Sequence, residues 1–370
     1  MTILFYSPFN NRSRDTESLM ITFKNQGHEV ISLSQAAGND IHPYLTSVGI
    51  KALSYVVKDK NWFLYYLKHI VFLISVCRRY NVKVIYSHLE SANFVATISQ
   101  FFMKAKVIIY RHHVDEAALQ GFDNTLFYKL TYRWAKKIIA VSNRAVRYMI
   151  DVEGISENKI IKINLGYDFS LYDNPNAFNV TKIREEASGS LLLLTVGRLN
   201  KYKRVDLSIL VLSKLLEQGI DAKLFVLGTG AEAIKLQAIA RSLQMEDKVK
   251  MIGHVTNVID YLQASDFILH PSILESSCVV VKEAGLVKKP VIVCRGVGDF
   301  DDYLIHGVNG FCVKSDSKSF VDEAVEVVIQ NHENLSKRTS VGEELYASVV
   351  SLFHINTTID QHNKLIQASN

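Results

Sequence analysis

Two glutamates, Glu275 and Glu283, have the spacing that most directly suggests chemistry in this chain. Between them lie two serines and a cysteine, followed by an apolar stretch from Val279 that predicts a helix. A helix beginning there offers unpaired backbone N–H groups and the positive end of its dipole, which suits a phosphate. The two carboxylates can accept hydrogen bonds from sugar hydroxyls. The alternative interpretation is a core helix flanked by two solvated glutamates.

The segments around these glutamates predict how the chain positions them. An apolar run, 266–270, predicts a strand that ends at Pro271-Ser272, and a second strand is predicted at 291–294 after Pro290. The order is therefore strand, loop, helix, strand, with Glu275 in the loop. Ligands of open parallel sheets bind outside the carboxyl ends of the strands, where such loops lie.

With Pro271-Ser272 before it and Lys289-Pro290 after it, this segment resembles the Glu-x7-Glu signature of family 4 of the retaining glycosyltransferases, which have the GT-B fold. The resemblance implies that Glu275 lies at the donor sugar and that Glu283 holds the ribose of the nucleotide. The family usually has Gly-aromatic-Gly after the first glutamate, whereas this chain has Ser-Ser-Cys. That departure affects the identity of the donor more than the fold, because the backbone N–H groups are kept.

A basic turn at 197–206 resembles the Gly-Arg-Leu…Lys-Gly-x-Asp motif of the same family, with Arg204 in place of the second glycine. The resemblance implies that Arg198 and Lys203 neutralise the donor diphosphate. A departing nucleoside diphosphate gains negative charge, which two fixed cations stabilise without a metal. A solvated basic turn is the alternative. The resemblance also assigns further residues to the substrate, namely Gly197, Gly228, His254, Ser276, Ser277 and Cys278.

A histidine pair follows the predicted strand 106–110 in the first half of the chain. The resemblance implies that a histidine here lies near the reacting donor, and His112 is the better match by register. Successive strand residues face opposite sides, so only one of His112 and His113 is expected to enter the cleft. No third metal ligand is near them in the sequence, and we expect neither a metal nor a cofactor.

Helical and strand-like stretches alternate along most of the chain, which predicts doubly wound α/β domains. A length of 370 residues favours two of them. The resemblance implies two Rossmann-like domains facing across a cleft. We expect an acceptor-binding domain at 1–170, a linker at 171–189 where periodicity is lost, and a nucleotide-sugar domain at 190–350. We expect residues 351–370 to form a helix that returns to the first domain.

Composition narrows the class of protein. The four cysteines are scattered without a CxxC pair, which argues against a zinc site or a disulfide framework and favours a reducing, cytoplasmic compartment. Net charge is +7 for residues 1–175 and −2 for 176–370. A basic face suits an anionic membrane or substrate better than nucleic acid here, because the basic residues are dispersed.

One apolar, aromatic-rich segment, 61–77, has lysines before it and Arg78-Arg79 after it. Such a helix can lie on a membrane surface. It can also be a buried helix packed on the sheet, and both hold if only one face docks. We therefore expect weak peripheral contact with the inner face of the membrane.

These features predict a retaining, metal-independent glycosyltransferase. It would move a sugar from a nucleotide diphosphate donor to an acceptor hydroxyl, in the biosynthesis of a bacterial surface polysaccharide such as an exopolysaccharide, capsule or lipopolysaccharide, with a glycan or lipid-linked acceptor. Two alternatives stay open. One is a nucleotide-sugar epimerase or hydrolase on the same scaffold, and the other is a non-catalytic nucleotide-sugar-binding partner of a glycan assembly complex.

Overall fold

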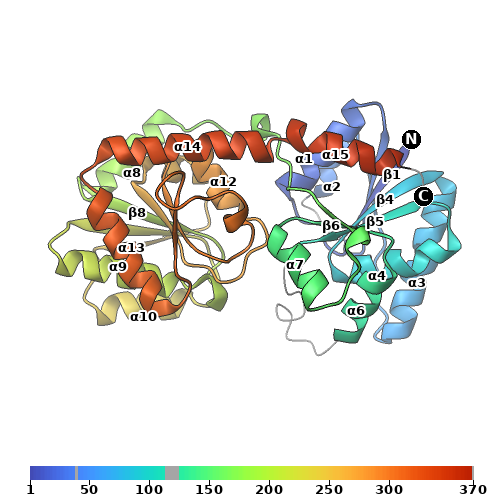
Figure 1. Ribbon diagram of the computed structural model, residues 1–370, viewed down its shortest axis with the longest axis horizontal. Helices are drawn as coiled ribbons and strands as arrows, with labels where there is room; N and C mark the ends of the chain where they lie inside the picture. Colours follow the sequence, from blue (N-terminus) through green and yellow to red (C-terminus); the bar gives the residue numbers. More distant parts are fainter. Residues whose placement is uncertain (38–40, 113–124, 369–370) are drawn as a thin grey trace. The chain divides into compact units, whose positions relative to one another are not determined.

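The computed structural model describes residues 1–37, 41–112 and 125–368 of the chain. It divides into two compact units, Met1–Phe169 with Phe353–Asn370, and Ser170–Leu352. Each unit is built on one parallel sheet with helices on both of its faces (Figure 1). The predicted fold class, two doubly wound α/β domains, is confirmed.

The first unit has a seven-stranded sheet in the order β3-β2-β1-β4-β5-β6-β7. Its strands are β1 (Thr2–Ser7), β2 (Glu29–Ser34), β3 (Lys51–Ser54), β4 (Val82–His88), β5 (Lys106–Arg111), β6 (Lys137–Ala140) and β7 (Ile160–Lys162). Its helices are α1 (Arg14–Asn25), α2 (Ile41–Ser47), α3 (Trp62–Arg79), α4 (Glu90–Ser99), α6 (Thr125–Trp134), α7 (Asn143–Asp151) and α15 (Ile355–Gln367).

The second unit has a six-stranded sheet in the order β10-β9-β8-β11-β12-β13. Its strands are β8 (Leu191–Val196), β9 (Ala222–Leu227), β10 (Val249–Gly253), β11 (Phe267–His270), β12 (Val291–Cys294) and β13 (Phe311–Val313). Its helices are α8 (Ala177–Ala187), α9 (Val205–Glu217), α10 (Ala233–Ser242), α11 (Val258–Ala264), α12 (Val279–Leu286), α13 (Ser317–Asn331) and α14 (Leu335–Phe353).

The strand order in the second sheet determines where its loops converge. From β8 the chain runs through β9 and β10 to one edge, and then returns to β11 on the other side of β8. The order therefore reverses between β8 and β11, which pair in parallel. A crevice opens at such a reversal, outside the carboxyl ends of the two strands. The loops after β8 and β11 meet there.

The stretch predicted as a linker, 171–189, is structured. Helix α8 occupies most of it and packs on α11 within the second unit. Asp260 of α11 anchors the start of α8, because its carboxylate accepts hydrogen bonds from the Asn176 backbone at 2.7 Å and the Asn179 side chain at 2.7 Å. The sequence analysis missed this helix, and it missed two short strands, β3 and β13.

Residues after Phe353 belong to the first unit. The Tyr167 N–H donates to Phe353 O at 2.7 Å, and the Ile355 N–H donates to Tyr167 O at 2.9 Å. Helix α15 then lies against α1 (Figure 1). Its buried His362 contacts the hydroxyls of Tyr86 and Tyr110, each at 3.3 Å.

Two buried histidines make the first unit sensitive to acid. Burial lowers the pKa of His69 to about 4 and that of His362 to about 3. Between pH 6.5 and these values, the unfolded chain binds protons that the folded chain does not, so stability falls as pH falls. We expect a lower thermal midpoint at pH 5 than at pH 7, and His362→Asn should reduce that difference. The exposed His254 provides the control His254→Asn, and an equal pH response in all three proteins would contradict the assignment.

Candidate functional site

The second sheet gathers the predicted donor-site residues at one edge. Gly197 follows β8, Gly228 follows β9 and His254 follows β10, while Glu275 lies in the loop after β11. Because all of these strands are parallel, their carboxyl ends share one edge. Gly228 has φ +125°, and a Cβ there would lie 1.9 Å from Gly197 O. Only glycine therefore permits this close approach of the loops after β8 and β9.

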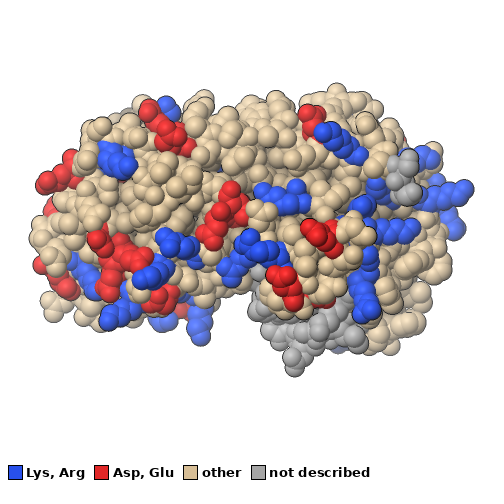
Figure 2. Space-filling view, in the orientation of Figure 1, with Lys and Arg blue, Asp and Glu red and all other residues tan. Residues whose placement is uncertain are grey.

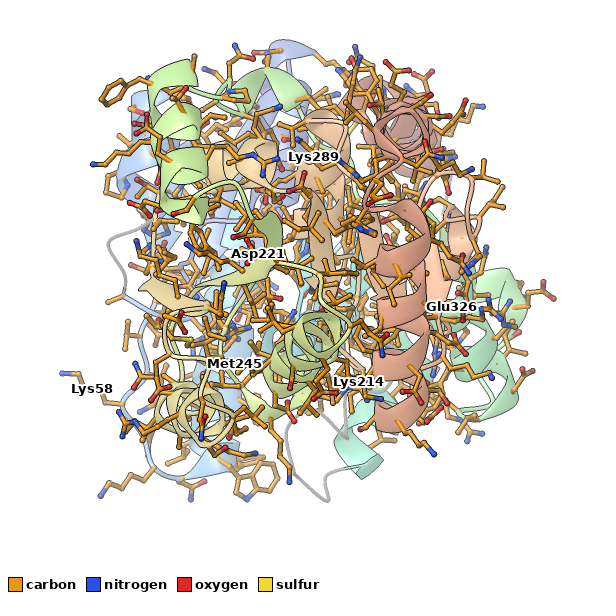
Figure 3. The ribbon with its side chains drawn as sticks, turned by 90° about the vertical axis from the view of Figure 1, so that its left-hand side faces the viewer. Lys58, Lys214, Asp221, Met245, Lys289 and Glu326 are labelled. Atoms are coloured by element: carbon orange, nitrogen blue, oxygen red, sulfur yellow. The ribbon has the colours of Figure 1, made fainter. Side chains whose placement is uncertain are left out.

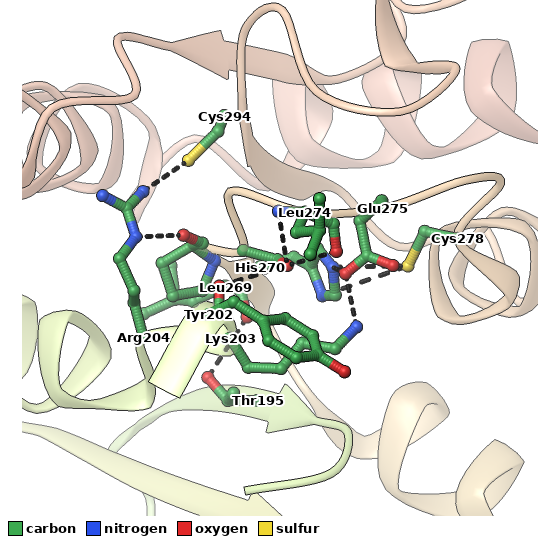
Figure 4. A network of polar contacts seen from close by, with 12 residues as sticks. Thr195, Tyr202, Lys203, Arg204, Leu269, His270, Leu274, Glu275, Cys278 and Cys294 are labelled. Carbon is green, nitrogen blue, oxygen red and sulfur yellow. Dashed lines mark hydrogen bonds and ion pairs between the residues drawn. The ribbon is translucent and has the colours of Figure 1, made fainter. Parts of the chain in front are cut away.

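Glu275 is the centre of a polar cluster formed by the loops after β8 and β11 (Figure 4). Its Oε1 accepts a hydrogen bond from Lys203 Nζ, and the two groups form an ion pair. The same oxygen lies 2.7 Å from His270 Nε2. Both Glu275 and Lys203 are largely buried, and His270 is buried at the end of β11. The structure thus brings together two of the predicted catalytic residues, Lys203 and Glu275.

Electrostatics keeps these groups charged. Burial alone would raise the pKa of Glu275, but the His270 and Lys203 cations outweigh it and hold that pKa well below its usual range. Burial likewise opposes charge on His270, while the Cys278 sulfur and the Glu275 carboxylate raise its pKa to about 9. Burial also opposes charge on Lys203, yet Glu275 raises its pKa. At neutral pH the cluster is an anion between two cations.

Among the described residues, one group has the donor atoms of a metal site: His270, Glu275 and Cys278 place one ligand atom each within 4.8 Å of one another. Cys278 Sγ lies 3.4 Å from His270 Nε2. Lys203 binds the same Glu275 oxygen that faces His270. An ammonium at that oxygen repels a divalent cation, so the donor set fits a network of proton-sharing groups better than a metal centre.

Arg204, which stands where the family usually has glycine, ties the basic turn to its neighbours. Its backbone has φ +48°, in the left-handed region, which costs a non-glycine residue about 1 kcal/mol. Its guanidinium donates to Pro271 O at 2.8 Å and Cys294 Sγ at 3.1 Å (Figure 4), and also to Ser315 O at 2.7 Å. These contacts join the loop after β8 to the ends of β11 and β12 and to the segment after β13. The arginine thereby fixes the residue before it, Lys203.

Two of the predicted substrate-binding residues, Ser277 and Cys278, have buried side chains that face other protein groups. The buried Ser277 hydroxyl donates to Asp299 Oδ2 at 2.6 Å, and the buried Cys278 sulfur faces His270. Of Ser276, Ser277 and Cys278, only Ser276 is partly exposed. Any contact of Ser277 or Cys278 with a ligand would therefore run through backbone groups.

Helix α12 begins at Val279, as predicted, and no side chain caps its first N–H groups. Glu283 lies in its second turn and is partly exposed. The second predicted cation, Arg198, is exposed, as is His254. Neither side chain has a hydrogen bond or ion pair with another residue in the described part of the chain. Arg198 and His254 thus lie in loops at the carboxyl edge of the second sheet, with their side chains open to solvent.

The first unit positions the remaining predicted catalytic residue. His112 follows β5, and its Nε2 lies 3.0 Å from Nδ1 of the buried His88 at the end of β4. Burial lowers the pKa of His112, and the Asp15 carboxylate opposes this only in part. The preceding Arg111 is fully buried and pairs with Glu153 at 2.7 Å. His113, the other candidate, lies outside the described residues.

The sequence analysis missed His88, His270 and Arg204 as site residues. His88 and His270 are the last residues of strands β4 and β11, next to the loops that hold predicted residues. Their position at strand ends was the available signal. Arg204 was noted only as a departure from the family pattern, because no local rule shows that its side chain reaches three other segments.

A cavity of about 420 Å³ lies in the second unit, away from the polar cluster around Glu275. Its lining includes Leu191 and Asp221, at the amino-terminal ends of β8 and β9, together with Arg184, Asp266 and Arg338. Figure 3 shows Asp221 and, nearer the top of the view, Lys289. The cavity is thus at the opposite end of the strands from Glu275, and a bidentate Arg184–Asp266 pair occupies its charged wall.

Comparison with protein families identifies both halves of the chain. A model described as "Glycosyltransferase Family 4" matches residues 14–171, and one described as "Glycosyl transferases group 1" matches residues 178–345. The two matches together span most of the sequence and divide it near the boundary between the two units.

Individual proteins are similar over most of the chain at low identity. The N-acetyl-α-D-glucosaminyl L-malate synthase of Bacillus anthracis is 24% identical and covers 79% of this chain and 76% of its own length. The capsular polysaccharide biosynthesis glycosyltransferase CapM of Staphylococcus aureus is 23% identical and covers 75% of this chain and 74% of its own. The structure of Anabaena HepE in complex with UDP has a TM-score of 0.83 at 20% identity, with 99% of both chains covered.

Proposed function

Because the chain belongs to the glycosyltransferases described by these two family models, with the GT-B fold, we propose that it transfers a sugar from a nucleotide diphosphate donor to an acceptor hydroxyl with retention of configuration. The observation that carries the proposal is the buried Glu275–Lys203 pair at the strand-order reversal of the second sheet. It combines an ionised carboxylate for sugar hydroxyls with a cation for phosphate.

In the proposed complex each residue has a distinct task. The start of α12 and the cations Arg198 and Lys203 bind the diphosphate, and Glu283 binds the ribose. As the bond to the sugar breaks, negative charge grows on the leaving diphosphate, and fixed cations stabilise that charge without reorganising. Glu275 orients the sugar, and the acceptor attacks the face that the diphosphate leaves.

A uridine nucleotide is the first donor to test, since Anabaena HepE was solved with UDP. The acceptor we propose is a growing bacterial surface glycan, because CapM of Staphylococcus aureus is a capsular polysaccharide enzyme. Thermal unfolding with a panel of nucleoside diphosphates and their sugars tests donor binding. A ligand at one hundred times its Kd stabilises the native state by about 2.7 kcal/mol. No stabilisation by any nucleotide or nucleotide sugar would overturn the proposal.

Transfer is expected to persist in excess EDTA, because Arg198 and Lys203 supply the positive charge that a metal would otherwise supply. Product formed with the best donor should be equal in EDTA, magnesium and manganese. Complete loss in EDTA that either metal restores would contradict the metal-free mechanism. Sugar release without acceptor, or conversion of one nucleotide sugar into another, would instead favour the hydrolase or epimerase alternative.

We also propose that the first unit touches an anionic membrane surface through α3. One face of this helix is buried, with His69, Leu73, Val76 and Cys77, so the prediction of a packed helix is confirmed. The opposite face exposes Leu64, Leu67 and Val71 by 40 to 60%, and the first turn of the helix exposes Trp62 by 61% and Phe63 by 58%. Lys and Arg side chains predominate over the first unit in Figure 2. No helix in the described part of the chain is long and apolar enough to cross a membrane.

Liposome co-sedimentation tests this surface. Binding should be stronger to anionic than to neutral vesicles and should weaken with salt, because it combines aromatic insertion with charge attraction. Trp62→Ser with Phe63→Ser should lower the bound fraction. Phe178→Ser, at an exposed aromatic residue of the second unit, is the control. Equal binding to both lipids, or none at low salt, would count against the proposal.

A further inference from the structure

Behind the Glu275 loop lies a buried trio that none of the roles above uses. Lys282 of α12 contacts Asp299 Oδ2 at 2.7 Å, in the loop after β12. The Ser277 hydroxyl reaches the same oxygen at 2.6 Å, and Lys282 Nζ lies 2.9 Å from Ser277 Oγ. The side chains of Lys282 and Asp299 are 1% and 0% exposed. We call these three residues the lock.

Burying the charged groups of the lock costs free energy, which indicates a role other than packing. Burying two opposite charges removes them from water, and apolar side chains of similar volume often give equal or greater stability. The Asp299 carboxylate depends strongly on its two partners, because its other oxygen, Oδ1, is buried without a hydrogen-bond partner among the described residues. Both polar contacts of this carboxylate therefore converge on one oxygen, between the helix and the loop.

The lock lies directly against the residue that is proposed to hold the sugar. Ser277 is in the same loop as Glu275, and Gly298 precedes Asp299. Gly298 has φ +56°, and a Cβ there would lie 2.9 Å from Glu275 Cβ and 3.1 Å from Ser276 O. The loop after β12 thus packs on the back of the Glu275 loop, and the Ser277 hydroxyl fastens the two together.

We propose that Lys282, Asp299 and Ser277 are positioning residues that hold the Glu275 loop in register with Lys203. This inference rests on the proposed function, since it concerns the geometry of the donor sugar. A misplacement of about 1 Å at a reacting centre can cost about a hundredfold in rate. Of the residues proposed to bind the nucleotide, Arg198 and Lys203 belong to the basic turn after β8, outside the lock, whereas Glu283 follows Lys282 in α12. Loosening the lock should therefore lower the rate of the sugar step more than it weakens nucleotide binding.

A paired substitution separates positioning from stability. Lys282→Met alone leaves a buried carboxylate without its cation, so this variant should have a much lower thermal midpoint. Adding Asp299→Leu removes that carboxylate and should restore the midpoint to within a few degrees of wild type. The Ser277 hydroxyl then has no acceptor at residue 299, so kcat should stay about tenfold or more below wild type. Affinity for UDP should fall by a smaller factor than kcat does.

The control is Lys214→Met with Asp322→Asn, which removes the charges of an exposed ion pair in the same unit and should leave kcat unchanged. A second test leaves the buried ion pair intact. Ser277→Ala should lower kcat by a larger factor than it lowers UDP affinity, and Ser277→Thr, which keeps the hydroxyl, should restore kcat. Wild-type kcat in a stable Lys282→Met, Asp299→Leu protein, or in Ser277→Ala, would overturn the positioning role proposed for the lock. Failure of the wild-type protein to bind UDP or any nucleotide sugar would instead overturn the proposed function.

Discussion

Replacing Lys203 by alanine is expected to lower turnover at least about tenfold. A hydrogen bond to a charged group contributes about 1.5–3 kcal/mol, and each 1.36 kcal/mol of transition-state stabilisation changes the rate about tenfold. In the proposed function Lys203 affects both the diphosphate and the sugar. It belongs to the basic turn after β8, and it pairs with Glu275. Arg198→Ala should lower turnover to a similar degree.

The two substitutions should differ in their effect on stability. Lys203→Ala leaves the buried Glu275 carboxylate with His270 as its remaining cationic partner, so the thermal midpoint should fall. Arg198 is exposed, so Arg198→Ala should not change the midpoint. The exposed neighbour Lys201 gives the matched control, Lys201→Ala. Steady-state kinetics at saturating donor decides the matter, and wild-type kcat in both Lys203→Ala and Arg198→Ala would refute the phosphate role.

The second large effect separates the two glutamates. Glu283→Gln should weaken binding of the free nucleoside diphosphate as well as of the whole donor, because a ribose contact exists in the ground state and the transition state alike. Glu275→Gln should leave diphosphate binding nearly intact and lower kcat about tenfold or more, because a contact to the reacting sugar strengthens as charge develops. The low pKa of Glu275 predicts that this loss is constant from pH 6 to pH 8.

Calorimetry with UDP and kinetics with the donor measure these two effects separately. Gln is nearly isosteric with Glu, so both variants keep the side-chain volume. Glu275→Gln also removes the negative partner of Lys203 and His270, and unfolding should be measured beside the kinetics. Equal loss of UDP affinity in the two variants would show that the assignment of the carboxylates is wrong.

Glu275 and the lock are proposed to act on the reaction in different ways, although both involve the loop after β11. In the proposed function the Glu275 carboxylate contacts the sugar, whereas the side chains of Lys282 and Asp299 are buried and pair with each other. A change in Glu275 should therefore alter the chemistry directly, while loss of the lock should alter it through geometry. Values of kcat measured at the same saturating donor concentration allow the effect of Glu275→Gln to be compared directly with the effect of losing the lock.

The sequence by itself determined most of the strands, the helix after Glu275 and the position of Glu275 in the loop after a strand. These features are local: alternating apolar runs predict strands, and Glu275 to Glu283 needs only one loop and one helix. Apolar periodicity did not predict α8 within 171–189, because most residues of that stretch are polar. That helix is held by the distant Asp260, and its stability comes from a contact that periodicity does not record.

The tertiary structure alone decided which groups meet. Lys203 and Glu275 are separated by 72 positions, and they pair because the strand order reverses between β8 and β11. The same non-local packing ties Arg204 to three other segments and buries Lys282 on Asp299, whereas His270 owes its charge to Glu275 and Cys278 in the loop that follows it. A sequence specifies the reach of each side chain, but only the order and register of the strands determine which partner lies within that reach.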